Sequence, residues 1–203
     1  MRIRWAIVVM LLTGLAGPVR SQTTATDTLP GSRITNAGVL RATGATDSVF
    51  ILRALPSDTV DIGDFTAFLL AQIGAPPFDS TLAFKVTSDS LRVRINGRIM
   101  DFPPSQRAEL GPLFGFLDST TVVTAEVSMP QADGGIMVFR LEKLLVKGFA
   151  IPDILVLGAL AKYRAQYPKM LAAGGKEFHA AMPKQATATL TTNGIVLRMP
   201  PKP

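Results

Sequence analysis

The sequence predicts an α+β fold: a curved antiparallel sheet, built from hairpins, that packs on three helices. Three observations support this fold class. Apolar residues recur with helical spacing in three segments, they alternate with polar residues in the segments between, and Gly, Pro or Asn-Gly signals separate the two patterns. A helix followed by a hairpin is therefore expected three times, in residues 61–99, 103–147 and 151–197. The three units share no residue-level repeat.

The first unit begins with a helix that Asp61 is expected to cap, with Asp64 in its first turn, where a negative charge suits the helix dipole. Gly74 and the prolines after it end this helix. Residues 82–86 and 91–99 then alternate as a half-buried hairpin. Upstream of the helix, the apolar run 49–52 is expected to be a strand. The apolar positions of the helix are Ile62, Phe65, Phe68, Leu69 and Ile73.

The second unit opens at Pro103, and its helix must break at Gly111-Pro112 because proline removes a backbone donor. A strand from residue 123, a turn over residues 130–135 and a return strand over residues 136–147 follow. The apolar part of the helix comprises Leu113, Phe114, Phe116 and Leu117, and Val123, Ala125, Val127 and Met129 share one face of the strand.

The third unit opens at Ile151-Pro152, where proline suits the first helical position, and its helix runs to about Tyr167. A closing hairpin is expected between residues 186–190 and 195–197. Asn193-Gly194, between these two β-type runs, is a strong hairpin signal.

The N-terminus has the pattern of a secretory signal peptide over residues 1–21. A basic start and an apolar run to Leu15 precede Val19 and Ser21, which suit cleavage after Ser21. The run is about half of the ~20 residues that cross a bilayer, and an uncleaved anchor is the alternative. No cysteine follows it, which excludes a lipoprotein. A periplasmic or extracellular protein is expected, with a flexible leader over residues 22–45 and one α+β domain over residues 46–203, because the leader has few large apolar groups.

Composition and net charge limit the classes of function that the chain could have. The chain has no cysteine, so packing alone must stabilise the domain in a compartment that permits disulfides. The net charge of +6 falls to about +3 once Arg2, Arg4 and Arg20 leave with the signal. Residues 81–203 carry the surplus, which suits an anionic surface and is also ordinary for a soluble domain. The basic residues are dispersed, so nucleic-acid binding is not expected.

No catalytic or metal-binding constellation is recognised, and no cofactor is expected. His179 is the only histidine, so a zinc site of His and Cys ligands cannot form. A Ser-His-Asp triad would need the same histidine, yet the chain lacks the usual G-x-S-x-G motif. Asp58, Asp61 and Asp64 lack a calcium-loop pattern, and helix capping explains them better. Glu126 and Glu142 could face one another across a hairpin, but the water-facing side of the strand is expected for both. A hydrolase with an unfamiliar site remains open.

The segment from Ile154 to Ala161 is apolar around almost the whole helix. Such a helix must hide more than one face from water, in a deep core, against a partner protein or around an apolar ligand. Basic strand residues suggest either a solvated sheet face or a patch for anionic lipid headgroups. These residues are Arg92, Arg94, Arg98, Lys143 and Lys147.

The order of these features resembles the tubular lipid-binding superfamily, in particular its small bacterial periplasmic members. Three short motifs over about residues 60–200 carry the resemblance: Asp64-Phe65-Thr66-Ala67-Phe68-Leu69-Leu70, Val146-Lys147-Gly148-Phe149-Ala150-Ile151-Pro152 and Gly194-Ile195-Val196-Leu197. The resemblance implies a curved sheet that wraps a helix, an acyl chain in the groove between them and no catalytic set.

The sequence therefore favours an extracytoplasmic, non-catalytic protein that binds or carries a lipid or another hydrophobe. Apolar side chains would provide the affinity, and the basic strand residues would direct the protein to anionic membranes. The alternative is a structural or interaction module of the cell envelope without a ligand cavity. The sequence does not define an oligomeric state. The expected lining residues are Phe65, Phe68, Leu69, Leu113, Phe114, Leu117, Leu157 and Leu160.

Overall fold

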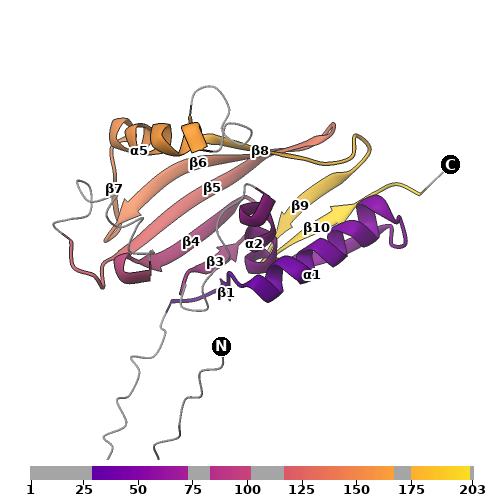
Figure 1. Cartoon of the computed structure of the whole chain (residues 1–203), viewed down its shortest axis with the longest axis horizontal. Helices are drawn as coiled ribbons and strands as arrows, with labels where there is room; N and C mark the ends of the chain where they lie inside the picture. The colour runs from indigo at the N-terminus through magenta and orange to yellow at the C-terminus, as the bar shows by residue number, and fades with distance from the viewer. Residues whose placement is uncertain (1–28, 73–82, 102–116, 167–174, 202–203) are drawn as a thin grey trace, which may run out of the picture.

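A computed structural model describes residues 29–72, 83–101, 117–166 and 175–201, and these residues confirm the α+β fold. Figure 1 shows a large antiparallel sheet, a smaller sheet beside it and helices packed along them. The large sheet has the order β1-β3-β4-β5-β6-β7, and β8 also pairs with β6. Its strands are β1 (Ser32–Arg33), β3 (Lys85–Ser88), β4 (Arg92–Arg98), β5 (Val122–Asp133), β6 (Ile136–Val146), β7 (Phe149–Ala150) and β8 (Glu177–Ala181).

The smaller sheet has the order β2-β10-β9. The expected C-terminal hairpin forms two of its strands, β9 (Thr187–Thr191) and β10 (Gly194–Arg198), joined by Thr192 and Asn193. The third strand is β2 (Ser57–Asp61), which pairs with β10 from far upstream in the chain. The closing hairpin therefore pairs with β2 and belongs to a sheet separate from the large one.

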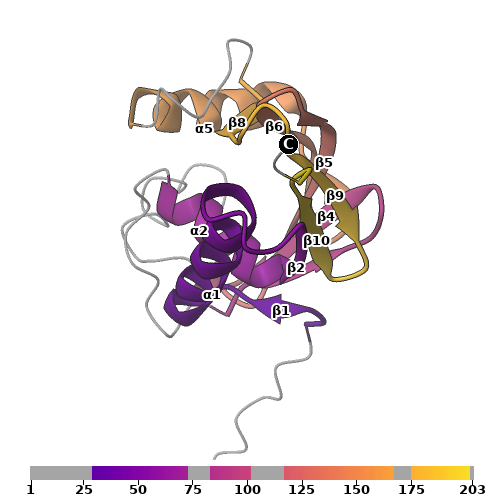
Figure 2. The same ribbon diagram turned by 90° about the vertical axis from the view of Figure 1, so that its right-hand side faces the viewer.

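The helices are α1 (Asn36–Thr46), α2 (Ile62–Gln72) and α5 (Asp153–Gln166), with a π-helical turn at Asp47–Ile51 and a 3-10 turn at Ile99–Asp101. In Figure 2 the large sheet curves, with α5 near one end of the arc and the α1–α2 pair near the other. The main hydrophobic core lies between α1, α2 and both sheets and includes Phe65, Ile195 and Leu197. A smaller cluster at the other end of the large sheet joins Ile99, Val123 and Val146.

The expected flexible leader over residues 22–45 is wrong for its second half. Residues 32–33 form β1 and residues 36–46 form α1, so the folded domain begins well before residue 46. Thr35 caps α1, since its hydroxyl accepts a hydrogen bond from the Gly38 amide at 2.9 Å. Gly38 and Ala42 are buried against α2. This helix needs no large apolar groups, because small side chains let the two helices approach closely.

Three further local predictions were wrong. Residues 49–52 were expected to be a strand, but residues 49–51 belong to the π-helical turn Asp47–Ile51, which continues α1, and Leu52 follows it. Val49 and Phe50 are buried, whereas Ile51 and Leu52 are each 71% exposed. The turn expected over residues 130–135 is shorter, because β5 continues to Asp133 and only Gly134 and Gly135, both with positive φ, form the turn. Leu91, expected on the buried face of its strand, is 73% exposed just before β4.

Candidate functional site

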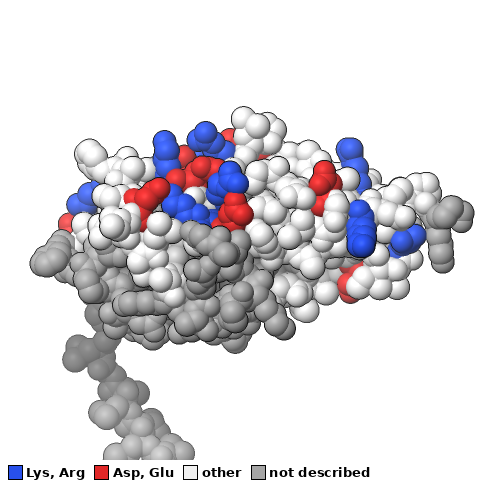
Figure 3. Space-filling view, turned by 90° about the horizontal axis from the view of Figure 1, so that it is seen from above, with Lys and Arg blue, Asp and Glu red and all other residues white. Residues whose placement is uncertain are grey.

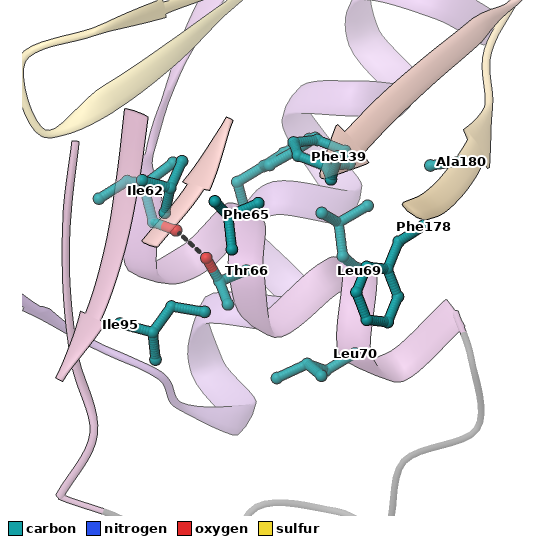
Figure 4. A pocket seen from close by; sticks show the side chains of 11 residues that line it. Ile62, Phe65, Thr66, Leu69, Leu70, Ile95, Phe139, Phe178 and Ala180 are labelled. Atoms are coloured by element: carbon teal, nitrogen blue, oxygen red, sulfur yellow. Dashed lines mark hydrogen bonds between the residues drawn. The ribbon is translucent and has the colours of Figure 1, made fainter. Parts of the chain in front are cut away.

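An apolar pocket of about 150 Å³ lies between α2 and the large sheet (Figure 4). Helix α2 contributes one wall and strands β4, β5, β6 and β8 contribute the other. The lining residues are Ile62, Phe65, Thr66, Leu69, Leu70, Val93, Ile95, Val127, Phe139, Phe178 and Ala180.

The two periodicities of the chain explain which residues line the pocket. On α2 the lining residues are spaced by three or four, which places them on one face of the helix. On β4 the lining residues Val93 and Ile95 are two apart, so both point to the same side of the sheet. Antiparallel pairing then sets Val93 opposite Val127, and Phe139 opposite Phe178. The pocket is therefore formed where the apolar stripe of a helix meets the apolar face of a sheet.

The pocket has a deep end and a more accessible end. Ile62 and Phe65 are each 1% exposed and Phe139 is 7% exposed, so this part of the lining belongs to the core. Leu69, Leu70 and Phe178 are only partly buried. Figure 4 shows these three side chains together at the end of the pocket away from Ile62. A ligand would therefore reach the pocket from the C-terminal end of α2 and from β8.

Among the described residues, the lining carries no ionisable side chain. The one polar side chain in this described lining is Thr66, whose hydroxyl donates a hydrogen bond to the Ile62 carbonyl at 2.7 Å. A cavity of this volume with an apolar lining holds about one aromatic ring or a short hydrocarbon chain. Such a site binds through dispersion and the transfer of apolar surface from water, and it offers no acid, base or nucleophile.

Helix α2 is held against α1 by a paired charge and by close backbone packing. Arg41 donates two hydrogen bonds to the Asp64 carboxylate, both at 2.6 Å, and Asp64 is 7% exposed. The hydrogen bond and the charge of Asp64 raise the pKa of Arg41 above its ordinary value. A Cβ on Gly38 would lie 2.5 Å from Asp64 Oδ1, so glycine is required at this contact. Helix α2, which forms one wall of the pocket, is therefore held in place by α1 on the side that faces away from the pocket.

Of the three aspartates considered for calcium binding, Asp58 and Asp61 accept hydrogen bonds from backbone amides, and Asp64 forms a salt bridge with Arg41. Asp61 Oδ1 accepts hydrogen bonds from the amides of Gly63 at 2.8 Å and Asp64 at 3.2 Å, which is the predicted cap of α2. Asp58 Oδ1 accepts from the Thr59 amide at 2.8 Å. Within the described residues, no group of three or more His, Cys, Asp or Glu side chains could hold a metal ion.

Two of the predicted lining residues, Phe65 and Leu69, do line the pocket. Phe68 lies beside it, with its ring centroid 6.0 Å from that of Phe65. Leu117 packs on the small cluster of Ile99, Val123 and Val146 instead. Leu113 and Phe114 lie outside the described residues.

Leu157 and Leu160 belong to α5 and do not line this pocket, which is lined from α2 and four strands. The predicted lining included none of the strand residues. The alternation of β4 and β5 was recognised, but it did not show that their apolar face meets α2, and the alternation of β6 and β8 is weak. Helical spacing could have identified Leu70. Phe139 and Phe178 could be found only from the strand pairing.

The opposite face of the large sheet carries charges of both signs. Glu126 on β5 forms salt bridges with Arg94 at 3.1 Å and Arg92 at 3.4 Å, both on β4. Arg140 on β6 pairs with Glu177 on β8 at 2.6 Å. Figure 3, a view of the molecule from above, shows basic and acidic side chains intermingled. Pairing lowers the net positive charge that this face would present to an anionic membrane.

The other predicted membrane-facing residues are less closely paired. Lys147, at the turn between β6 and β7, lies 4.0 Å from Asp118, and its side chain is 56% exposed. Lys143 stands opposite Glu126 in the strand register. The backbone amide of Arg98 donates to Asp101 at 2.6 Å. The five predicted basic residues therefore lie along the large sheet, but acidic residues are interspersed among them.

The two glutamates considered for catalysis do not face one another. Glu126 is opposite Lys143, and a register shift after Glu126 adds one residue to β6, so that Glu142 accepts a hydrogen bond from the Ser128 hydroxyl at 2.6 Å. His179 Nε2 lies 3.3 Å from Glu177 Oε2. Hydrogen bonds from Arg140 and then His179 lower the pKa of Glu177 below its ordinary value.

Helix α5 and the adjoining β7 expose large apolar side chains. Phe149 and Ile154 are each 78% exposed, Leu155 is 46% exposed and Leu157 is 37% exposed, whereas Val156 is buried. A lysine-aspartate pair, Lys176 with Asp153 at 2.6 Å, lies at the start of the helix. In the described part of the chain, no helix has the length and apolar character to cross a membrane.

In comparisons with known proteins, no protein family, curated protein or solved structure matches the chain.

Proposed function

We propose that this is an exported, non-catalytic protein that binds a small hydrophobe, or the apolar end of a lipid, in the pocket between α2 and the large sheet. The observation that supports the proposal most is the lining itself: apolar side chains surround about 150 Å³, and the single hydroxyl in the described part of the lining is already hydrogen-bonded. A buried volume of this chemistry favours an uncharged apolar group and disfavours polar or ionic ligands, which would lose their hydration without compensation.

The dimensions of the pocket define the part of the ligand that it would hold. About 150 Å³ suits one ring or a short chain. A longer acyl chain would therefore place its end in the pocket and continue past Leu70 and Phe178. The resemblance to tubular lipid-binding proteins supports the same class of ligand, with the acyl chain between helix and sheet.

A pair of substitutions on β8 tests the proposal. Ala180 lines the pocket and Ala181, the next residue, does not. Ala180→Phe should fill the pocket and abolish binding of butylbenzene, measured by ligand-observed NMR, and of palmitate, measured by native mass spectrometry. Ala181→Phe should bind both probes as the unmodified protein does. Equal binding by the two variants, or no binding by the unmodified protein, contradicts the proposal.

The exposed apolar patch of Phe149, Ile154, Leu155 and Leu157 favours a second candidate function, an interaction module that docks on another component of the cell envelope. Leu157→Asp distinguishes the two functions. Because Leu157 is already 37% exposed, the variant should fold. In the docking function it would lose co-purification with an envelope partner and keep binding of the apolar probes unaltered. In the pocket function it would change neither property.

A further inference from the structure

Strand β7 and the first half of helix α5 form an exposed apolar surface at one end of the large sheet. Figure 1 shows both elements on the side of the molecule away from α1. In the described part of the chain, no residue of α5 belongs to either hydrophobic cluster. The core therefore does not use the apolar groups of this β7–α5 surface, which are Phe149, Ile154, Leu155 and Leu157.

The apolar side chains protrude from the domain. Phe149 directly follows the turn Lys147-Gly148, where both residues have positive φ and β6 reverses into β7. Phe149 and Ile154 are each 78% exposed, so little of either side chain rests on the domain. Folded protein partners pack on one another with closely matched shapes. Protruding side chains instead suit a fluid bilayer, which closes around them at the boundary between headgroups and acyl chains.

The charge of this region suits anionic headgroups. Residues 147–166 contain three basic residues and one acidic residue, which gives a net charge of +2. The acidic residue, Asp153, already lies 2.6 Å from Lys176 Nζ in a salt bridge. Each basic residue close to an anionic membrane adds to the attraction. The three basic residues are Lys147, Lys162 and Arg164.

Lys147 is the basic residue next to the protruding phenylalanine. It lies two residues before Phe149, its side chain is 56% exposed, and Asp118, with which it forms an ion pair, is 4.0 Å away. An exposed pair at this distance contributes little. The arginines of β4, on the outer face of the sheet, are held more closely, because Glu126 forms salt bridges with them at 3.1 and 3.4 Å. The positive charge beside β7 is therefore less compensated than the charge on that face.

The length of α5 decides how the helix meets a bilayer. It has 14 residues, whereas about 20 are needed to cross the hydrocarbon core. An apolar helix that is too short to cross lies along the interface, with its basic residues at the level of the headgroups. The order of residues fits this position, because the apolar run 154–161 lies between Lys147 and the two basic residues near the end of α5.

We propose that the β7–α5 surface docks the protein on a lipid bilayer that contains anionic headgroups. Phe149 and Ile154 enter the boundary between headgroups and acyl chains, and Lys147 lies among the phosphates. The inference goes beyond the apolar pocket and does not depend on it. It rests on the exposed patch of the second candidate function and names a bilayer, in place of a protein, as the partner.

Tryptophan reporters in the full chain test this proposal. Trp5 is the only tryptophan, so in a Trp5→Phe background a single new tryptophan reports its own surroundings. Phe149→Trp is the reporter on the docking surface, and Leu40→Trp, at a position on α1 that is 75% exposed, is its matched control. The probes are vesicles of phosphatidylglycerol and phosphatidylcholine in equal parts, and vesicles of phosphatidylcholine alone.

The mixed vesicles should shift the emission of Phe149→Trp to shorter wavelength, and lipids brominated on their acyl chains should quench it. The emission of Leu40→Trp should not change. Three outcomes would overturn the proposal: no change at Phe149→Trp, which would leave a protein partner as the occupant, an equal change in both reporters, or an equal response to phosphatidylcholine alone. A shift that appears without vesicles as the protein concentration rises would identify a second copy as the occupant and would also reject the bilayer.

A pair of apolar substitutions, made in the Phe149→Trp reporter and titrated with mixed vesicles, gives a second readout. Ile154→Asp should weaken binding to the vesicles by about tenfold or more, because a charge replaces a side chain that the boundary would bury. Leu40→Asp should leave binding unchanged. Both positions are highly exposed, so both variants should fold. Equal binding by the two variants would count against docking through this surface.

A pair of lysine substitutions in the same reporter tests the headgroups. Lys147→Gln should weaken binding to the mixed vesicles by about fivefold. Lys184→Gln is the matched control, because Lys184 is exposed and lies beside Gly135, at the opposite end of the β5–β6 hairpin. An equal effect of the two substitutions would contradict a local role of Lys147. All these variants should bind butylbenzene as the unmodified protein does, so a failure of docking is distinguishable from a failure of the pocket.

Discussion

Helices α2 and α5 each contain a long apolar run, but the two runs have different surroundings. Residues 62–67 of α2 are all buried, whereas α5 exposes Ile154, Leu155 and Leu157 and buries Val156. The difference lies in the partners. Helix α2 packs closely on α1 at Gly38, where a Cβ would lie 2.5 Å from Asp64 Oδ1, and on β1 at Gly63, where a Cβ would lie 2.6 Å from the Arg33 carbonyl. A Cβ on Gly158 of α5 would meet nothing within 4 Å. An apolar helix is buried only where a neighbour has the shape to receive it.

The largest expected effect is at Phe65. Phe65→Ala removes a side chain that is 1% exposed and enlarges the pocket that it lines, so the free energy of unfolding should fall by about 3–5 kcal/mol. Ile154→Ala, on α5, should change it by less than about 0.5 kcal/mol. Urea denaturation of the two variants measures both values. Similar losses would mean that α5 is as well packed as α2.

A smaller effect is expected where α1 meets α2. Gly38→Ala should destabilise the protein by about 1–3 kcal/mol, because the new methyl group would displace the Asp64 carboxylate that Arg41 holds. Gly44→Ala is the matched control on the same helix: nothing lies within 4 Å of its Cβ, so the better helix propensity of alanine should add about 0.5–1 kcal/mol. The two midpoints of thermal unfolding should therefore move in opposite directions.

A glycine-to-alanine substitution on α5 extends the comparison to that helix. Gly158→Ala should raise the free energy of unfolding by up to about 1 kcal/mol, since a Cβ there meets open space. The gain would be absent if α5 unfolds separately from the rest of the domain, which hydrogen exchange of its amides would reveal. A loss of stability would contradict the open surroundings of this helix.

The smallest effect concerns the charged face of the large sheet. Hydrogen bonds from Arg140 and His179 hold the pKa of Glu177 below its ordinary value of 4.5. A carboxylate whose pKa is lowered by folding stabilises the native state above its unfolded pKa, and this contribution is lost as the pH falls through the lowered value. The urea midpoint should therefore decline below about pH 4.5. In Glu177→Gln that decline should be shallower, and an identical profile would show that the Arg140–Glu177 pair contributes nothing.

Much of the local structure could be predicted from the sequence. The cap at Asp61, the helix that follows it and the closing hairpin all depend on neighbours a few residues away, and the structure confirms them. Phe65 and Leu69 of the candidate pocket were found for the same reason, as their helical spacing is visible in the chain. Helix α1 was missed because its burial comes from Gly38 and Ala42, two residues without apolar bulk.

The remaining features depend on contacts between distant segments. Arg92 and Arg94 do not form a purely basic patch, because both form salt bridges with Glu126 on the next strand. The place of Phe178 beside Phe139 followed from the register of β8 on β6, and the division into two sheets followed from the pairing of β2 with β10. None of these pairings leaves a signal in the local periodicity.

The sequence by itself determined the α+β class, the boundaries of its strongest elements, the absence of disulfides and the apolar face of α2. Tertiary structure alone decided which apolar helix is buried, where the apolar pocket forms and which strand edges remain unpaired. The physical reason is range: propensity, capping and turn chemistry act within a few residues. Strand register and helix packing are instead settled by shape and hydrogen bonding between segments that meet only when the chain folds.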